Sequence, residues 1–315
     1  MSHDATSNRH WASIGEAGFT SGMRFLLWLH RIGGHHLFRL ALYPVIFWYV
    51  VMRRAARHAS ADYLARLHAH SGGSTPAPRF ANVFRHFMSF GQNLLDKLRA
   101  WSGEQDWAVH FTGQDELLDM ARQGRGAVVV MAHMGNLEVS RVIGALHGLR
   151  INALVHTRHA QRFNTLLKSL NPDSGLQLMQ VGALDPATAM QLSAKVAAGE
   201  IIMIAGDRVP LDDSRATLRL PFLGAEADFP IGPYVLAGLL RCPLFGMLTS
   251  EQADGHHFRI FRMADEVRLD RRDRMASVRP LAQAFVQQLE TECHTAPLQW
   301  FNFFPFWASV APART

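Results

Sequence analysis

The chain has few of the residues on which several common protein classes depend. Its 315 residues include only two cysteines, Cys242 and Cys293, which lie far apart and have no C-x-x-C spacing. This usage argues against a disulfide framework and indicates a reducing cytoplasm. The sequence also has no G-x-S-x-G elbow and no H-E-x-x-H helix. These absences argue against a serine hydrolase and a zinc hydrolase, and the close pair His256/His257 has no acid at the spacing of a zinc motif.

Long apolar runs are also missing. The most apolar stretch, Leu37–Met52, has 16 residues and contains Arg39 and Pro44, whereas a membrane-spanning helix needs about 20 apolar residues. We therefore expect a helix hairpin that lies in the membrane interface, with a true span and a core helix as the alternatives. The first 20 residues are polar and have no apolar core, so we expect no signal peptide.

The basic residues are nearly all arginine, since only three of the 32 are lysine. Arginine suits bidentate capture of phosphate. Residues 1–70 hold eight arginines and three acids, which gives +5 of the whole chain's +6. Basic, aromatic and aliphatic residues together are typical of binding to an anionic membrane surface. The arginines alternate with Leu, Phe and Trp at helical spacing instead of forming one polar face, so we expect no nucleic acid partner.

Alternating strand and helix patterns predict an α/β fold with a mostly parallel central sheet flanked by helices. The strands are expected at 109–111, 126–132, 151–156, 176–181, 201–205, 218–222, 243–249 and 258–262. The helices are expected at 80–101, 137–147, 160–170, 186–198, 235–240 and 275–292. We predict three regions: an N-terminal helical membrane-associated arm at 1–70, a linker at 71–79 and the α/β domain at 80–315.

The strongest chemical signal is the segment His133-Met134-Gly135-Asn136-Leu137-Glu138. It follows the apolar strand Gly126–Ala132 directly, so His133 is placed at the strand's carboxyl end. Gly135 allows a sharp turn, and Asn136 is a good N-cap for the next helix. Glu138 would then lie in the first helical turn and face the histidine. A carboxylate beside an imidazole fixes its tautomer and favours proton abstraction from a hydroxyl.

With this His-x4-Glu segment, the chain resembles the acyl-CoA/acyl-carrier-protein-dependent membrane acyltransferases. More narrowly, it resembles the late acyltransferases of lipid A biosynthesis, the lauroyl and myristoyl transferases. The resemblance covers roughly Phe19 to Trp307. Its blocks are Gly22-Met23-Arg24-Phe25-Leu26-Leu27-Trp28-Leu29, His133–Glu138, Gly199-Glu200 followed by Ala205-Gly206-Asp207-Arg208, and Leu220-Pro221-Phe222-Leu223-Gly224.

The resemblance implies a glycerolipid acyltransferase-like fold and transfer of a fatty acyl chain from a thioester of acyl carrier protein or coenzyme A. The acceptor would be a hydroxyl of a membrane lipid, such as a lipid A precursor or related glycolipid. His133 would be the general base and Glu138 would orient it. The reaction requires no metal or organic cofactor. The implied location is the cytoplasmic face of the bacterial inner membrane, with peripheral or monotopic attachment.

The resemblance and the strand ends add substrate-binding candidates. Asn136 is either a helix cap or a substrate contact, and Arg158 would hold the acceptor or the reacting carbonyl. Asp207 follows strand 201–205, so it is expected at the same sheet edge as His133, where ligands of α/β sheets bind. Asp207 would orient a substrate group or pair with Arg208. Two further candidates for phosphate binding, which could instead lie on a solvated strand edge, are Arg215 and Arg219.

Two questions stay open from the sequence. The aromatic tail Trp300–Trp307 either packs on the core as a clasp, lines an acyl tunnel or enters the membrane. Other functions also remain, namely a glycerophospholipid, amino-acid-lipid or polyene-pigment acyltransferase, or a non-catalytic membrane-binding lipid carrier. The presence of both His133 and Glu138 argues against the last.

Overall fold

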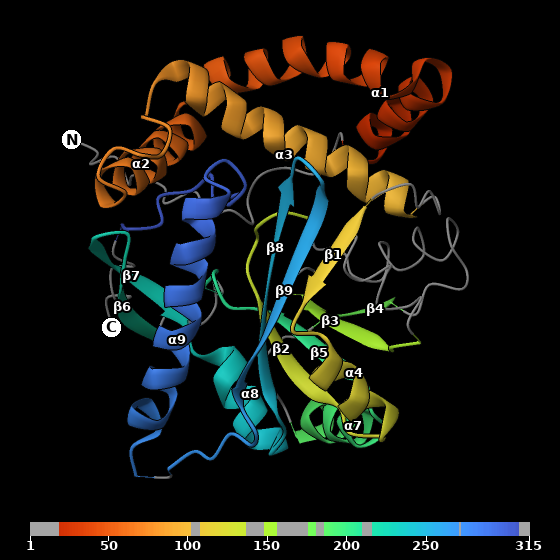
Figure 1. The fold of residues 1–315 in the computed structure, drawn as a ribbon, viewed down its shortest axis with the longest axis vertical. Helices are drawn as coiled ribbons and strands as arrows, with labels where there is room; N and C mark the ends of the chain where they lie inside the picture. The colour runs from red at the N-terminus through yellow and green to blue at the C-terminus, as the bar shows by residue number, and fades with distance from the viewer. Residues whose placement is uncertain are drawn as a thin grey trace, which may run out of the picture.

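The computed structural model describes residues 19–101, 108–136, 148–155, 176–180, 186–209, 216–270 and 272–308. Within these ranges the chain forms a twisted sheet with helices on both faces and three helices at one end (Figure 1). The predicted helices at 137–147 and 160–170 lie outside the described residues.

The central sheet has the strand order β1-β9-β8-β2-β5-β3-β4. The pairs β2–β5, β2–β8, β3–β5, β3–β4 and β1–β9 are parallel, and β8–β9 is antiparallel. The predicted mostly parallel sheet is therefore confirmed. Its strands are β1 (Val109–Thr112), β2 (Ala127–Met131), β3 (Ile151–Val155), β4 (Leu176–Gln180), β5 (Ile201–Ala205), β8 (Leu244–Gln252) and β9 (Gly255–Ala264).

The hairpin β8–β9 reverses the direction of one side of the sheet, which the sequence did not indicate. Because β9 runs against β8, the amino ends of β9 and of its parallel partner β1 lie at the same edge as the carboxyl ends of β2, β5 and β8. This edge therefore carries both the predicted catalytic segment and the turn of the hairpin.

The sheet is covered on both faces, and β2 shows why its sequence is continuously apolar. Val128 and Val130 join the larger core cluster, while Val129 and Met131 join a second cluster on the other face. The first face packs against α7 (Pro186–Ala197), α8 (Gly232–Leu240) and α9 (Arg274–Thr295), and the second against α4 (Asp115–Arg122).

A separate two-stranded ribbon packs against α9. It consists of β6 (Thr217–Phe222) and β7 (Ala225–Pro230), joined by a two-residue turn in which Leu223 and Gly224 have positive φ. Such turns match the twist of a hairpin. The sequence predicted the strand at 218–222 but not its partner at 225–230, and it did not predict α4.

Three helices lie at the carboxyl edge of β2: α1 (Phe19–Met52), α2 (Arg54–His70) and α3 (Phe80–Trp101) (Figure 1). The predicted helix 80–101 is confirmed. Helix α1 bends at Gly34, whose φ is 62°. Its later half buries a stripe at four-residue spacing, Phe38, Leu42, Ile46 and Val50, in the main core cluster. This spacing is that of a helix with one buried face.

Residues 37–52 thus form a helix that is buried on one face and exposed on the other. No helix in the described part of the chain is long and apolar enough to cross a membrane. The division at 71–79 stays a prediction. Buried side chains of α1 and α2, including Leu64 and Leu67, belong to the same core cluster as the sheet.

Candidate active site

His133 lies two residues after β2, at the carboxyl edge of the sheet. Asp207 lies two residues after β5, the strand that pairs directly with β2. The Nδ1 atom of His133 is 2.8 Å from Oδ1 of Asp207, and the backbone N–H of His133 donates to Oδ2 at 2.8 Å. The prediction that the two residues share one edge of the sheet is therefore confirmed.

The carboxyl group of Asp207 is buried, with 2% of the residue exposed. Burial by itself would raise the pKa of Asp207, but the nearby His133 and its hydrogen bonds, together with the charge of Arg208, outweigh burial and lower it. Asp207 is therefore ionised and can only accept hydrogen bonds. His133 must donate from Nδ1, so the neutral imidazole has its basic lone pair on Nε2.

The C-terminal tail closes over this pair, so the structure favours a clasp for its buried residues. We call residues 299–307 the C-terminal clasp. Trp300 is fully buried, and its indole N–H donates to Oδ2 of Asp207 at 3.0 Å. The backbone of the clasp pairs with the loop that follows β2 in antiparallel fashion at Met134 and Trp300. The N–H of Phe301 donates to the carbonyl of His133, and that of Gly135 donates to the carbonyl of Gln299.

The clasp is held by α2 and α3 through a buried histidine. Nε2 of His86 lies 3.0 Å from the carbonyl oxygen of Trp300, and Nδ1 lies 2.8 Å from Oγ of Ser60. A carbonyl can only accept, so Nε2 carries the proton and the serine hydroxyl donates to Nδ1. Burial lowers the pKa of His86 to about 4, which keeps this side chain neutral. A line of hydrogen bonds thus runs from Ser60 of α2 through His86 and Trp300 to Asp207 and His133, and it is buried as far as Asp207.

Gly135 is required by the turn after His133. Its φ is 55°, and a Cβ built on it would lie 2.4 Å from the backbone oxygen of Thr249 in β8. The hydroxyl of Thr249 donates to the carbonyl of Met134. The sharp turn predicted at Gly135 is confirmed, and the close approach to β8 explains why a side chain is excluded there.

Of the remaining predicted site residues, three lie in the described part of the chain and three lie outside it. Asn136 is 2% exposed, and its side-chain amide donates to the carbonyl of Asn93 in α3 at 3.4 Å. Arg208 donates to the carbonyl of Phe301 in the clasp at 3.0 Å. Arg219 is exposed on β6, in the separate ribbon. Three candidates lie outside the described residues, so their roles stay predictions: Glu138, Arg158 and Arg215.

The direct contact of Asp207 with the ring of His133 was not predicted from the sequence, and neither were the contributions of Trp300 and His86. The strand-end position of Asp207 was the signal available, and it placed the residue correctly without its partner. Trp300 belonged to a tail with three possible roles, and nothing in the sequence distinguished His86 within the amphipathic helix 80–101.

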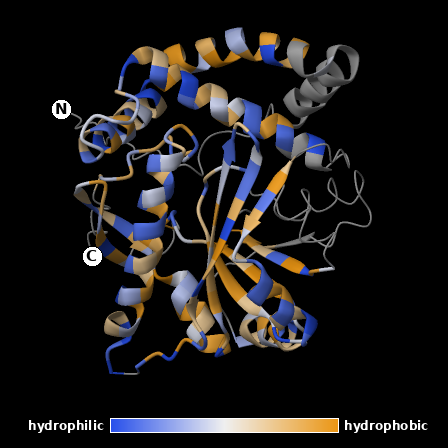
Figure 2. Ribbon diagram, in the orientation of Figure 1, coloured by the Kyte–Doolittle hydropathy of each residue, from blue (hydrophilic) through white to orange (hydrophobic). Residues whose placement is uncertain are grey.

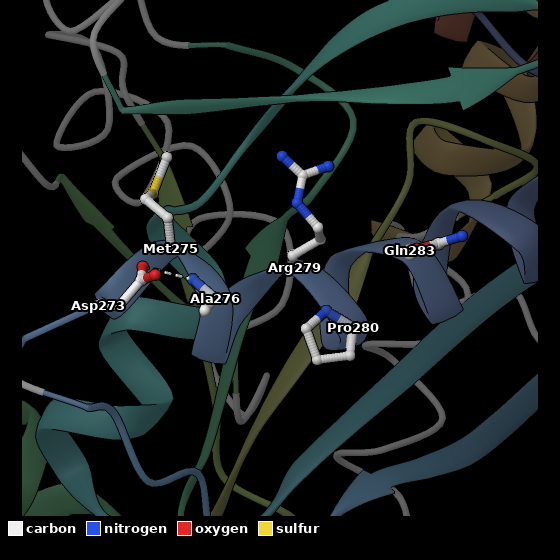
Figure 3. Close-up of a pocket in the computed structure, with 6 residues that line it drawn as sticks. All are labelled: Asp273, Met275, Ala276, Arg279, Pro280 and Gln283. Atoms are coloured by element: carbon white, nitrogen blue, oxygen red, sulfur yellow. Dashed lines mark hydrogen bonds between the residues drawn. The ribbon is translucent and has the colours of Figure 1, made fainter.

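A surface hollow lies elsewhere, at the beginning of α9 (Figure 3). It is lined by Asp273, Met275, Ala276, Arg279, Pro280 and Gln283. Asp273 caps α9 by accepting from the N–H of Ala276, and Arg279 donates to the carbonyl of Arg219. The hollow contains none of the predicted site residues, and its polar groups serve the helix start and the ribbon.

The fold and the site define an α/β protein that presents a histidine, oriented by a buried carboxylate, at the carboxyl edge of its sheet. This arrangement can draw a proton from a hydroxyl group. Residues 79–309 match the family model of the bacterial lipid A biosynthesis acyltransferases. The match covers most of the chain, which therefore belongs to this family and transfers an acyl group to a lipid. Comparison with curated proteins gives no match.

Proposed function

We propose that the protein transfers a fatty acyl chain from a thioester, with acyl carrier protein as the donor, to a hydroxyl of a membrane lipid such as a lipid A precursor. The observation that carries this proposal is the 2.8 Å contact between Nδ1 of His133 and Asp207. This contact leaves the lone pair of Nε2 available to accept a proton, which supports the proposed base, and the family match supplies the acyl transfer and the lipid acceptor.

In the proposed reaction, Nε2 of His133 takes the proton of the acceptor hydroxyl as its oxygen attacks the thioester carbonyl. The imidazolium that forms is stabilised by the carboxylate of Asp207. The tetrahedral intermediate collapses, the C–S bond breaks, and His133 returns the proton to the thiolate. The products are the ester and the free thiol, so no acyl-enzyme is required.

Two predicted residues complete this mechanism. Glu138 is proposed to orient the imidazole or the acceptor hydroxyl, in addition to Asp207. Arg158 is proposed to stabilise the oxyanion of the tetrahedral intermediate by charge-assisted hydrogen bonds.

The test is mass spectrometry of lipid extracts from cells without the gene, complemented with wild-type protein or with His133→Ala. We expect wild type to add one acyl chain to a lipid and His133→Ala to restore none, because general base catalysis contributes about 10²- to 10⁴-fold in rate. A folded His133→Ala protein that restores the lipid would contradict the mechanism. The lipid that changes identifies the acceptor, and an assay with acyl carrier protein and coenzyme A thioesters identifies the donor.

We also propose that α1 attaches the protein to the cytoplasmic face of the bacterial inner membrane. Its outer face exposes several large apolar side chains: Leu40 at 69%, Trp48 at 67%, Val45 at 59%, Met52 at 57% and Phe47 at 55%. In the ribbon of Figure 2, hydrophobic residues are frequent along α1, with hydrophilic ones between them. Phe80 of α3 continues the surface beside Phe47, with ring centroids 6.4 Å apart.

Basic residues border this apolar surface. Arg39, Arg53 and Arg54 are exposed beside it. Arg57 instead closes the end of α1 by donating to the carbonyls of Val50 and Val51, each at 3.0 Å. An apolar helix face bordered by arginines is the arrangement that binds anionic lipid headgroups and the acyl boundary below them.

A further inference from the structure

A second cluster of ligand-type side chains lies at the sheet edge, apart from His133. His110 of β1 and His257 of β9 are cross-strand partners, and their rings stack with centroids 4.7 Å apart. Asp254 lies in the turn between β8 and β9. Its Oδ1 is 2.8 Å from Nε2 of His257, and its Oδ2 is 3.6 Å from Nε2 of His110.

These groups have the chemistry and the spacing of a transition-metal site. One ligand atom of each residue lies within 4.8 Å of the other two. Two imidazole nitrogens and a carboxylate oxygen suit borderline cations, above all Zn²⁺. Tetrahedral bonds of about 2.0–2.1 Å place ligand atoms roughly 3.3 Å apart. The two distances, 2.8 Å from Nε2 of His257 to Oδ1 and 3.6 Å from Nε2 of His110 to Oδ2, show that each imidazole nitrogen has one oxygen of Asp254 near this spacing.

We propose that His110, Asp254 and His257 bind one divalent transition-metal ion, such as Zn²⁺, with solvent in the remaining position. The side chains of these residues are 46%, 62% and 29% exposed, so an ion can reach them from solution. Nε2 of His110 also lies 3.1 Å from the carbonyl oxygen of Asp254, and a bound ion would replace this contact. The three residues come from a strand, a turn and a neighbouring strand, and His110 lies more than 140 positions before Asp254 and His257 in the sequence.

The ion would stabilise the edge of the sheet that is formed by β1 and the hairpin β8–β9. In the described part of the chain β1 pairs only with β9, and the metal would join β1 to the hairpin turn. The same hairpin contacts the C-terminal clasp, because the backbone N–H of Glu251 donates to Gln299 and the amide of Gln299 donates to the carbonyl of Glu251. Bound metal would therefore stabilise the hairpin end that contacts the clasp and the loop after β2, without touching the reacting groups.

The test is calorimetric titration of Zn²⁺ into the full chain in detergent, without a histidine tag. We expect one equivalent to bind, His257→Ala to lose it, and His110→Ala to weaken it at least tenfold. Mg²⁺, which prefers oxygen ligands and octahedral geometry, should not bind there. Co²⁺ gives an independent readout, since its visible absorption reports nitrogen and oxygen coordination at a four- or five-coordinate site.

Two matched variants distinguish this site from other surface histidines. His58→Ala removes an exposed histidine of α2. His294→Ala removes one member of a second histidine pair, in which Nδ1 of His70 lies 3.0 Å from Nε2 of His294. Both variants should bind Zn²⁺ as the wild type does. Absence of binding to wild type, or unchanged binding to folded His110→Ala and His257→Ala, would overturn the proposal.

Discussion

At the scale of single residues, the group that accepts the hydrogen bond from Nδ1 of His133 decides the orientation and the tautomer of the imidazole. Asp207 accepts from the ring and the backbone of His133 and also from the indole of Trp300. A carboxylate that receives three hydrogen bonds in a buried position is fixed in orientation and in charge. The orientation of His133 is thus set by residues 74 and 167 positions away in sequence.

We expect Asp207→Asn to lower kcat by about two to four orders of magnitude, the usual range for a general base. The amide can donate to Nδ1 and so favour the tautomer that carries its proton on Nε2, which cannot accept the substrate's proton. Steady-state assay with an acyl thioester and a lipid acceptor measures this loss. The matched variant Glu226→Gln, at an exposed position of β7, should keep normal activity. A kcat near that of wild type in Asp207→Asn would show that Asp207 does not set the base.

Trp300→Phe keeps most of the ring packing and removes one donor to Asp207. Hydrogen bonds to charged groups contribute about 1.5–3 kcal/mol, so the pKa of Asp207 should rise and the acidic limb of the kcat–pH profile should move to higher pH. Trp307→Phe is the control, because the indole of Trp307 donates to the carbonyl of Phe222 and not to the carboxylate. We expect Trp307→Phe to lower thermal stability and to leave the kcat–pH profile unchanged. Identical profiles for both variants would rule out a positioning role for Trp300.

At the scale of elements, the two faces of α1 have different environments. The inner face of α1 packs on α3 at Gly91. Leu42 approaches Gly91 so closely that a Cβ atom built on this glycine would lie 2.8 Å from the Leu42 side chain. The outer face exposes aromatic and aliphatic side chains that the protein core does not use. From the sequence we expected an interfacial helix hairpin at 37–52, with a true span and a core helix as the alternatives. The structure has one continuous helix there, with apolar residues both on its buried face and on its exposed face.

The outer face of α1 predicts a specific loss of membrane binding. In sedimentation with vesicles that contain phosphatidylglycerol, Phe47→Ser together with Trp48→Ser should weaken binding at least tenfold, because burying a large apolar side chain contributes about 1.5–3 kcal/mol. Met190→Ser provides the control, since Met190 on α7 is 74% exposed and apolar but lies on another helix. Equal binding of the wild type and the double variant would exclude α1 as the contact surface.

At the scale of the whole molecule, the three helices, the sheet and the clasp share one core. Trp300 contacts Tyr63 of α2, Phe222 of β6 and Phe306 of the clasp, with ring centroids 4.9–5.2 Å apart. His86 links α3 to the same residue. Substitutions at this junction should therefore lower the free energy of unfolding and also change the position of His133.

The buried histidines predict how stability depends on pH. Burial lowers the pKa of His86 and of His256 to about 4 in the folded protein, while the unfolded chain protonates near pH 6.5. The unfolded state binds more protons between these values, so stability is full above pH 6.5 and falls as the pH drops toward 4. For His86 the loss amounts to about 3 kcal/mol.

Urea unfolding of the full chain at several pH values between 7.5 and 4.5 measures this dependence. His86→Gln removes the titrating group and should give a flatter dependence, while the exposed His58→Gln should follow the wild type. A wild-type free energy of unfolding that does not change over this range would contradict the burial of neutral His86. The lowered pKa of Asp207 adds a further loss only below about pH 4.

The sequence by itself determined the local features of this protein. Helix 80–101 was recognised from its apolar stripe, β2 from its run of valines, and the turn at Gly135 from the residue type. Each of these follows from interactions between neighbouring residues, which periodicity records. The placement of His133 and Asp207 at one edge also followed, since parallel strands end together.

Only the tertiary structure decided how distant segments meet. The pairing of Asp207 with His133, the burial of Trp300 and the proximity of His110 to Asp254 all join residues that lie far apart in the chain. The hairpin β8–β9 joins neighbouring strands, but its direction in the sheet depends on the pairing of β8 with β2. The packing of α1 and α3 decided which side of α1 is exposed. Such contacts arise from the sum of packing, strand order and burial over the whole molecule, which no local pattern in the sequence contains.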